Sequence, residues 1–246
     1  YTVGNEQEYH FKVLFLILAK LGYVWAKQCY HLSYGMVDLP TGKMKSREGT
    51  VVDADDLMEE MVREADKQTR EHGKLEGVSE DDLNTLFEMI GLSALKFFLL
   101  KVDPKKRMLF DPAESIQLQG FTGPFIQYTH ARIKAIIRKA ESMNITIEPN
   151  DLREVTTLEP AERDALQLLS QFENRVREAA KDYSPAVIAN YAFDMAKAYN
   201  QFYQNIPIFN ETDMAKLKFR IALSRSVASA IQKAMSMLGI LVPEKM

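Results

Sequence analysis

A short basic loop between two glycines holds the residues with the clearest chemical use. Lys43 offers a point positive charge to a phosphate, and Arg47 offers a planar guanidinium that can bind two oxygens at once. Gly42 and Gly49, on either side, let the backbone change conformation and approach a ligand closely. The pattern predicts contact with the phosphates of a nucleotide. The alternative is a solvated basic turn, because short motifs often match by chance.

Two pairs of side chains, each with a spacing of four residues, form a second candidate site. Tyr128 and Arg132 share one helix face, and Tyr199 and Tyr203 share another. Unpaired RNA bases stack on aromatic rings, so these faces are candidates for binding single-stranded RNA. The alternative is that each tyrosine is a half-buried core residue.

Four carboxylates follow the basic loop, at the start of an expected helix. They are Asp55, Asp56, Glu59 and Glu60. Negative charge is favourable there because the N-terminus of a helix carries partial positive charge. No histidine joins the four, so we interpret them as a helix start and predict no metal site. The single cysteine, Cys29, is interpreted as a small core or strand residue.

Apolar spacing, caps and prolines predict a mostly helical chain with a β-prone stretch at residues 23–34. The helices expected from these signals cover residues 6–20, 55–72, 79–100, 124–142, 160–173, 185–206 and 213–238. Asp53 or Asp55 is expected to cap the second of these helices, and Ser79 with Asp82 is expected to form a start like a capping box for the third. Ser184 is expected to cap the helix that begins at Pro185. A polar turn at residues 103–107 predicts a domain boundary, after which apolar stripes on successive helices indicate a bundle.

The composition is that of an ordinary globular protein, with 46% apolar and 26% charged residues among 246. The longest apolar run, residues 13–19, is too short to cross a bilayer, so no membrane partner is expected. The net charge is −3, but residues 101–150 hold 8 basic against 5 acidic side chains and residues 201–246 hold 6 against 3. Because local potential governs affinity for RNA, the net charge does not exclude an RNA-binding protein.

Segments along the whole chain resemble the class I aminoacyl-tRNA synthetases specific for arginine. Residues 43–50 resemble the family's degenerate KMSKS loop, and residues 4–11 resemble a strand end with a glutamine and a histidine before a helix. Residues 123–132 match the opening of the anticodon-binding domain, and residues 163–166 match its aspartate-alanine-leucine signature. Residues 238–246 match the family's ending, including a terminal methionine. The matches occur in the family's order, so the chain is identified as the C-terminal portion of an arginyl-tRNA synthetase.

The resemblance implies a mainly α fold. It implies the remnant of a Rossmann-like α/β catalytic core over residues 1–105, followed by an all-helical anticodon-binding bundle over residues 106–246. The implied reaction is the ATP-dependent attachment of L-arginine to arginine tRNA through an arginyl-adenylate. The implied setting is the cytoplasm, with a monomeric intact enzyme, Mg²⁺ accompanying ATP, no tightly bound cofactor and no DNA partner. The family's His-x-Gly-His signature does not occur here and is expected upstream, so this part alone is predicted to be inactive.

The resemblance also assigns roles to residues. It places the catalytic loop at Lys43, Met44, Ser46 and Arg47, the substrate at Gln7 and His10, and tRNA at Tyr128, Arg132, Tyr199, Tyr203 and Met246. It places the RNA contacts in the two basic segments. Class I ligation requires arginine and ATP held for in-line attack on the α-phosphate, with charge stabilised in the transition state. A neutral carboxamide such as that of Gln7 can accept a hydrogen bond from the substrate guanidinium.

Two loop residues depart from the family pattern. Lys45 stands where serine is usual, and Glu48 stands where a second lysine is usual. These departures support an alternative function, a non-catalytic tRNA-binding paralogue or regulatory RNA-binding module. Under the ligase hypothesis, Lys45 is the residue that can replace the missing cation.

Overall fold

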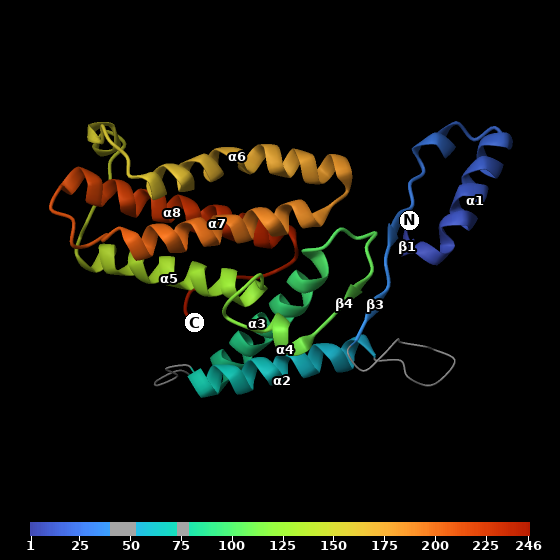
Figure 1. Ribbon diagram of the computed structural model, residues 1–246, viewed down its shortest axis with the longest axis horizontal. Helices are drawn as coiled ribbons and strands as arrows, with labels where there is room; N and C mark the ends of the chain where they lie inside the picture. The colour runs from blue at the N-terminus through green and yellow to red at the C-terminus, as the bar shows by residue number, and fades with distance from the viewer. Residues whose placement is uncertain (40–52, 73–78) are drawn as a thin grey trace.

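The computed structural model describes residues 1–39, 53–72 and 79–246, and most of its regular structure is helical (Figure 1). The N-terminal segment contains β1 (Thr2–Gly4), η1 (Asn5–Gln7), α1 (Glu8–Lys20), η2 (Val24–Gln28) and β2 (Leu32–Tyr34). This segment stands to one side of the other helices in Figure 1, and no residue of α1 is fully buried. The mainly α fold class is confirmed.

Two short pairs of parallel strands are found in the described part of the chain. β1 pairs with β2, with Val3 opposite Ser33, and β3 (Val37–Asp38) pairs with β4 (Met108–Leu109). Arg107 binds the carboxylate of Asp38 beside the second pair, with Nη2 2.7 Å from Oδ1. Parallel strands are typical of α/β proteins, in which helices connect them. The pairs therefore agree with the expected remnant of a Rossmann-like core.

The prediction of a β-prone stretch at residues 23–34 is wrong for the first half of the stretch. Its first half forms the 3-10 helix η2, and only β2 is a strand. Val24 and Trp25 favour strands, but they are 88% and 45% exposed. Strand propensity reflects packing on a half-buried surface. In this part of the chain neither side chain packs on such a surface, and residues 24–28 form η2.

Helices α2 (Ala54–His72) and α3 (Glu80–Leu100) pack together around one hydrophobic core. Asp53 accepts from the Asp55 backbone N–H at 3.0 Å and Ser79 accepts from that of Asp82 at 3.2 Å, which confirms both predicted helix starts. Gly91 lets the helices approach, because a Cβ there would lie 2.7 Å from a carbonyl oxygen of α2. We call this the α2–α3 core; its buried residues are Leu39, Met61, Ala65, Leu83, Phe87, Ile90, Ala94, Leu95, Phe98, Phe110 and Ile116.

Residues 123–246 form the predicted helical bundle, which has its own core. Its helices are α5 (Gly123–Ser142), α6 (Pro160–Asp182), α7 (Pro185–Asn205) and α8 (Met214–Met237), with α4 (Pro112–Ser115) before them and η4 (Asp151–Glu154) between α5 and α6. Figure 1 shows the four long helices lying side by side, above α2 and α3. The bundle core includes Ile126, Ile133, Ala165, Met195, Tyr199, Ile221, Val227 and Ile231.

Two predicted details of the bundle differ from the structure. α6 continues well beyond residue 173, because Val176 and Ala179 extend its apolar face onto the bundle core. Ser184 occupies the N-cap position of α7 as predicted, but its side chain makes no capping hydrogen bond. The prediction of a capping hydroxyl at Ser184 is therefore wrong, although the helix begins at Pro185.

A buried ion-pair network joins the start of α6 to α8. Arg220 Nε donates to Glu162 Oε1 at 2.7 Å, and the two side chains are only 4% and 2% exposed. Arg220 Nη1 also donates to Glu211 Oε2 at 2.6 Å. The second oxygen of Glu162 accepts from the Glu159 backbone N–H at 2.8 Å, which completes a capping box. Breaking a buried pair of this kind typically costs about 3–5 kcal/mol, so the network fixes α6 on α8.

Helix α3 belongs to both cores. Phe97 packs in the bundle core, whereas Leu95 and Phe98 pack in the α2–α3 core. Gly123 at the start of α5 crosses α3 at Ser93, where a Cβ would lie 2.5 Å from the hydroxyl oxygen. By length and composition alone α3 could span a membrane, but half of its most apolar stretch is buried inside the protein. A helix that serves two cores accounts for this apolar character.

The tail, residues 238–246, is hydrogen-bonded to both α3 and α5. The Lys96 ammonium on α3 donates to a tail carbonyl at 2.8 Å. The Gln127 carboxamide on α5 donates to the carbonyl of Leu241 at 2.7 Å and to that of Met89 on α3 at 3.2 Å. Gln127 is fully buried. One buried side chain therefore connects α5, α3 and the tail.

His130, one helical turn after Gln127, is also buried against the tail. Its Nδ1 lies 2.9 Å from the Pro243 carbonyl oxygen, which can only accept, so Nδ1 carries the proton. Burial lowers the pKa of His130; the Pro243 hydrogen bond opposes this shift, Lys134 adds to it, and Glu244 opposes it. The imidazole is therefore held in its neutral form.

We expect His130 to make stability depend on pH. Its pKa is lower in the folded than in the unfolded chain, so the stabilisation is complete above the ordinary value of 6.5 and is lost as the pH falls below it. His130→Asn keeps a short donor but cannot titrate. Urea unfolding at pH 7.5, 6 and 5 should show wild-type stability falling more steeply than that of the variant. Parallel curves for the two proteins would contradict this assignment.

Candidate functional site

The predicted catalytic loop lies outside the described residues. This applies to Lys43, Met44, Ser46 and Arg47, and also to Lys45 and Glu48. The described residues that flank it are Leu39, which is buried in the α2–α3 core, and Asp53, which caps α2. The roles assigned to the loop residues stay predictions.

Gln7 and His10 lie next to each other where β1 passes into α1. His10 Nδ1 is 2.5 Å from Gln7 Oε1, and both side chains are exposed. Ligands of open α/β sheets bind beyond the carboxyl ends of the strands, which is where these two residues follow β1. The structure therefore brings the two predicted substrate contacts together, and their contact with arginine stays a prediction.

Three of the predicted tRNA contacts meet on the surface formed by α5 and α7. The guanidinium carbon of Arg132 lies 4.8 Å from the ring centroid of Tyr128 and 5.1 Å from that of Tyr203. The two rings are 38% and 42% exposed. We call Tyr128, Arg132 and Tyr203 the aromatic–arginine group. It offers planar aromatic surface and a delocalised cation at one place.

Asn200 holds Arg132 in position, and Asn200 was not predicted from the sequence. Arg132 Nη1 donates to Asn200 Oδ1 at 2.5 Å, and Asn200 Nδ2 donates to the Thr129 hydroxyl at 2.8 Å. Asn200 lies three residues before Tyr203 on α7, so the helical spacing was the signal that could have identified it. A fixed guanidinium keeps both aromatic rings next to a positive charge.

Tyr199 does not join the aromatic–arginine group. It is fully buried in the bundle core and its hydroxyl donates to Ser224 Oγ at 2.9 Å. Burial raises the pKa of Tyr199, so its hydroxyl stays protonated at neutral pH. A base cannot stack on a ring with no exposed face, and we therefore assign Tyr199 to the core.

Met246 also lies apart from the group. Its side chain is partly buried against the α2–α3 core at the end of the tail. Its placement suits a packing role at the tail, and a direct contact with RNA stays a prediction.

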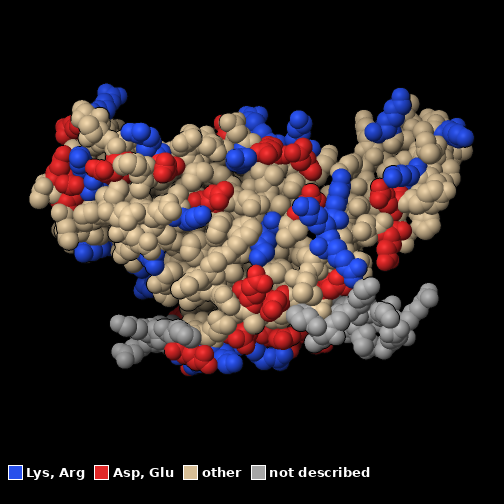
Figure 2. Space-filling model, in the orientation of Figure 1, with Lys and Arg blue, Asp and Glu red and all other residues tan. Residues whose placement is uncertain are grey.

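Charge is unevenly distributed over the surface. Figure 2 shows acidic side chains along the lower edge of the molecule, over α2, and basic side chains between the bundle and the N-terminal segment. Residues 51–100 hold 13 acidic against 5 basic side chains, which accounts for the acidic edge. Among the described residues, no group of histidine, cysteine and carboxylate side chains has the geometry of a metal site.

Two family profiles together match almost the whole chain. The profile described as tRNA synthetases class I (R), catalytic domain, matches residues 1–111, and the profile described as DALR anticodon binding domain matches residues 126–246. Over all 246 residues the chain is 55% identical to the arginine–tRNA ligase of Flavobacterium psychrophilum and 52% identical to that of Bacteroides thetaiotaomicron. It covers 40% and 41% of their lengths.

Solved structures agree with the sequence matches. The Thermus thermophilus arginyl-tRNA synthetase superposes on the whole chain with a TM-score of 0.86 at 29% identity, and 40% of that protein is covered. The arginyl-tRNA synthetase of Plasmodium falciparum, at 22% identity and a TM-score of 0.78, shares the fold. The chain thus spans about two fifths of the length of the relatives it matches. From these matches, the chain belongs to the arginyl-tRNA synthetase family and corresponds to the C-terminal part of its members.

Proposed function

We propose that this chain is the part of an arginine–tRNA ligase that supplies the ATP-contacting loop and reads the anticodon. The complete enzyme would join L-arginine to the α-phosphate of ATP with release of pyrophosphate, and then transfer the arginyl group to the 3′ end of its tRNA with release of AMP. The observation that carries the proposal is the aromatic–arginine group, exposed on a bundle that matches an anticodon-binding profile. The alternative, a non-catalytic RNA-binding paralogue, is not favoured, because the catalytic profile also matches residues 1–111.

The aromatic–arginine group suits the binding of unpaired bases. A base that leaves the helical stack can lie on the exposed face of Tyr128 or Tyr203. Each ring also lies close to the Arg132 guanidinium, which adds a cation near the bound base. Because Asn200, itself hydrogen-bonded to Thr129, already holds Arg132, little conformational freedom is lost when RNA binds. We propose this group as the centre of the anticodon contact. Met246 packs at the end of the tail, against the α2–α3 core.

The catalytic roles rest on the loop and on the residues after β1. We propose that Lys43 and Arg47 contact ATP phosphates, with Met44 and Ser46 shaping the loop and Lys45 supplying a further cation. Gln7 would accept a hydrogen bond from the substrate guanidinium, and His10 would face the adenylate site. Mg²⁺ would enter with ATP, held mainly by phosphate oxygens and water, as is usual for this ion.

Other properties of the complete protein are inferred in the same way. We propose a monomer in the cytoplasm, with ATP, L-arginine and arginine tRNA as its partners. The proposed division between residues 105 and 106 follows the polar turn at Asp103. Phe110 and Ile116, however, pack in the α2–α3 core, which argues for a boundary later in the chain.

The aromatic–arginine group should contribute directly to tRNA affinity. In the full-length protein, Tyr128→Ala should weaken binding of arginine tRNA by about 1–3 kcal/mol, because one stacked base loses its platform. Tyr23→Ala is the matched control, since Tyr23 is 48% exposed but lies in the N-terminal segment. Calorimetry at two salt concentrations measures both variants. Unchanged affinity for Tyr128→Ala would refute stacking at this position.

The Lys43 loop should act on the chemistry more than on tRNA binding. Lys43→Ala in the full-length protein should lower the rate of arginine-dependent ATP–pyrophosphate exchange by at least about 100-fold, as expected when a cation that stabilises the transition state is lost. Affinity for arginine tRNA should remain. The 246-residue chain by itself should form no arginyl-adenylate, because it spans two fifths of its relatives. Exchange activity unaffected by Lys43→Ala would remove the loop from the mechanism.

A further inference from the structure

Tyr183 has an unusual backbone conformation for an aromatic residue. It ends α6 with φ 50° and ψ 38°, in the left-handed region, and the next residue donates its backbone N–H to the Ala179 carbonyl at 3.0 Å. This position at a helix end normally favours glycine, because a Cβ is strained there. A bulky residue persists in such a conformation only when its surroundings hold it in place.

The ring of Tyr183 is held by a ring from another part of the fold. It stacks on Tyr30 in the N-terminal segment, with centroids 4.6 Å apart and planes inclined by 24°. In the described part of the chain, the hydrogen bonds and ion pairs of residues 1–34 stay within that segment. The Tyr30–Tyr183 stack is the ring contact that joins the segment to the bundle.

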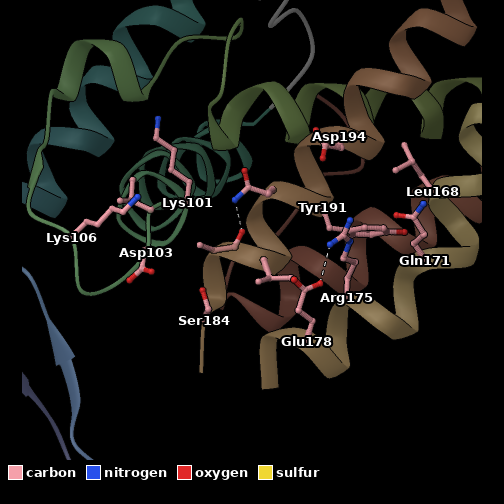
Figure 3. A pocket seen from close by; sticks show the side chains of 14 residues that line it. Lys101, Asp103, Lys106, Leu168, Gln171, Arg175, Glu178, Ser184, Tyr191 and Asp194 are labelled. Atoms are coloured by element: carbon pink, nitrogen blue, oxygen red, sulfur yellow. Dashed lines mark hydrogen bonds and ion pairs between the residues drawn. The ribbon is translucent and has the colours of Figure 1, made fainter. Parts of the chain in front are cut away.

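A cavity, rather than a region of packed side chains, lies beside the stack. Its volume is about 590 Å³, and it separates the turn after α3 from α6 and α7 (Figure 3). Lys101, Asp103 and Lys106 line it on one side, and Glu178 and Ser184, close in sequence to Tyr183, line it on the other. The turn after α3 is therefore separated from α6 and α7 by open space at this place.

The opposite side of the same junction is fixed by buried polar contacts. Gln127 joins α5 to α3 and to the tail, and Lys96 adds a second hydrogen bond to the tail. The junction between α3 and the bundle thus has buried hydrogen bonds on one side and a cavity on the other. The Tyr30–Tyr183 stack lies on the side of the cavity.

We infer that Tyr183 is a positioning residue that sets the orientation of the bundle relative to the N-terminal segment, residues 1–34, by stacking on Tyr30. The inference rests on the proposed function, because the orientation matters if one tRNA must reach both parts. Tyr183 lies outside the aromatic–arginine group, and its ring contact in the described part of the chain is with Tyr30. Its loss should therefore act on the placement of a bound tRNA and leave the affinity of the bundle for the anticodon unchanged.

Two substitutions at Tyr183 distinguish the effect of its ring from the effect of its backbone conformation. Tyr183→Gly removes the ring and relieves the strained conformation, so the midpoint of thermal unfolding should be unchanged or higher. Tyr183→Phe keeps the ring and should behave as wild type. In the full-length protein, Tyr183→Gly should lower kcat for arginylation by about 2- to 10-fold, the effect of losing one stacked aromatic pair, with KM for tRNA unchanged. Tyr30→Ala should give the same loss, and the double variant should be no worse than either.

A distance measurement provides a second readout that does not need activity. Spin labels at Lys20 on α1 and Glu173 on α6, both exposed, should give a narrow distance distribution in wild type and Tyr183→Phe and a broader one in Tyr183→Gly. A wild-type distribution and wild-type kcat for Tyr183→Gly would overturn the inference, as would equal losses in Tyr183→Phe and Tyr183→Gly. If the wild-type protein arginylates no tRNA, the proposed function fails, and the label distances alone then decide the role of Tyr183.

Discussion

The arrangement of this protein depends on α3 being packed on two sides at once. The helix supplies Phe97 to the bundle core and Phe98 to the α2–α3 core, and these adjacent residues point in different directions. Close approach is possible on both sides because small residues occupy the crossings, at Gly91 against α2 and at Gly123 of α5 against Ser93. A larger residue at either glycine would push one of the two cores away from α3.

Helix α5 carries this constraint to the candidate RNA site. Gln127 and His130 are buried and hold the tail and α3, whereas Tyr128 and Arg132 lie on the side that faces α7 and solvent. The helical period places these two pairs on different faces of one short stretch. A base bound to Tyr128 would therefore contact a helix that is held on α3 and on the tail. The buried Arg220–Glu162 network plays the equivalent role inside the bundle, where it fixes α6 on α8.

The sequence predicted local features well, because they depend on neighbouring residues. Asp53 and Ser79 begin their helices as expected, since a short polar side chain can reach the free N–H groups of the next turn. Prediction from the sequence failed where contacts between residues far apart in the chain decide the local structure or the exposure of a side chain. Val24 and Trp25 have strand propensity but lie in the 3-10 helix η2, and Tyr199 and Tyr203 are both tyrosines on α7 but have opposite exposure. Only the packing of α8, which supplies Ser224, shows that Tyr199 faces inward. Family resemblance located the loop of Lys43, which lies outside the described residues.

We propose that the bundle reads the anticodon for an arginine–tRNA ligase, and arginylation of two tRNA transcripts tests this. The full-length protein is given two transcripts of arginine tRNA that differ only in the anticodon, one native and one taken from another amino acid, and kcat/KM for arginylation is compared. If unpaired bases stack on the aromatic–arginine group, the native anticodon should be preferred by about 5- to 150-fold, the range expected from 1–3 kcal/mol of stacking energy. Equal kcat/KM for the two transcripts would contradict the account.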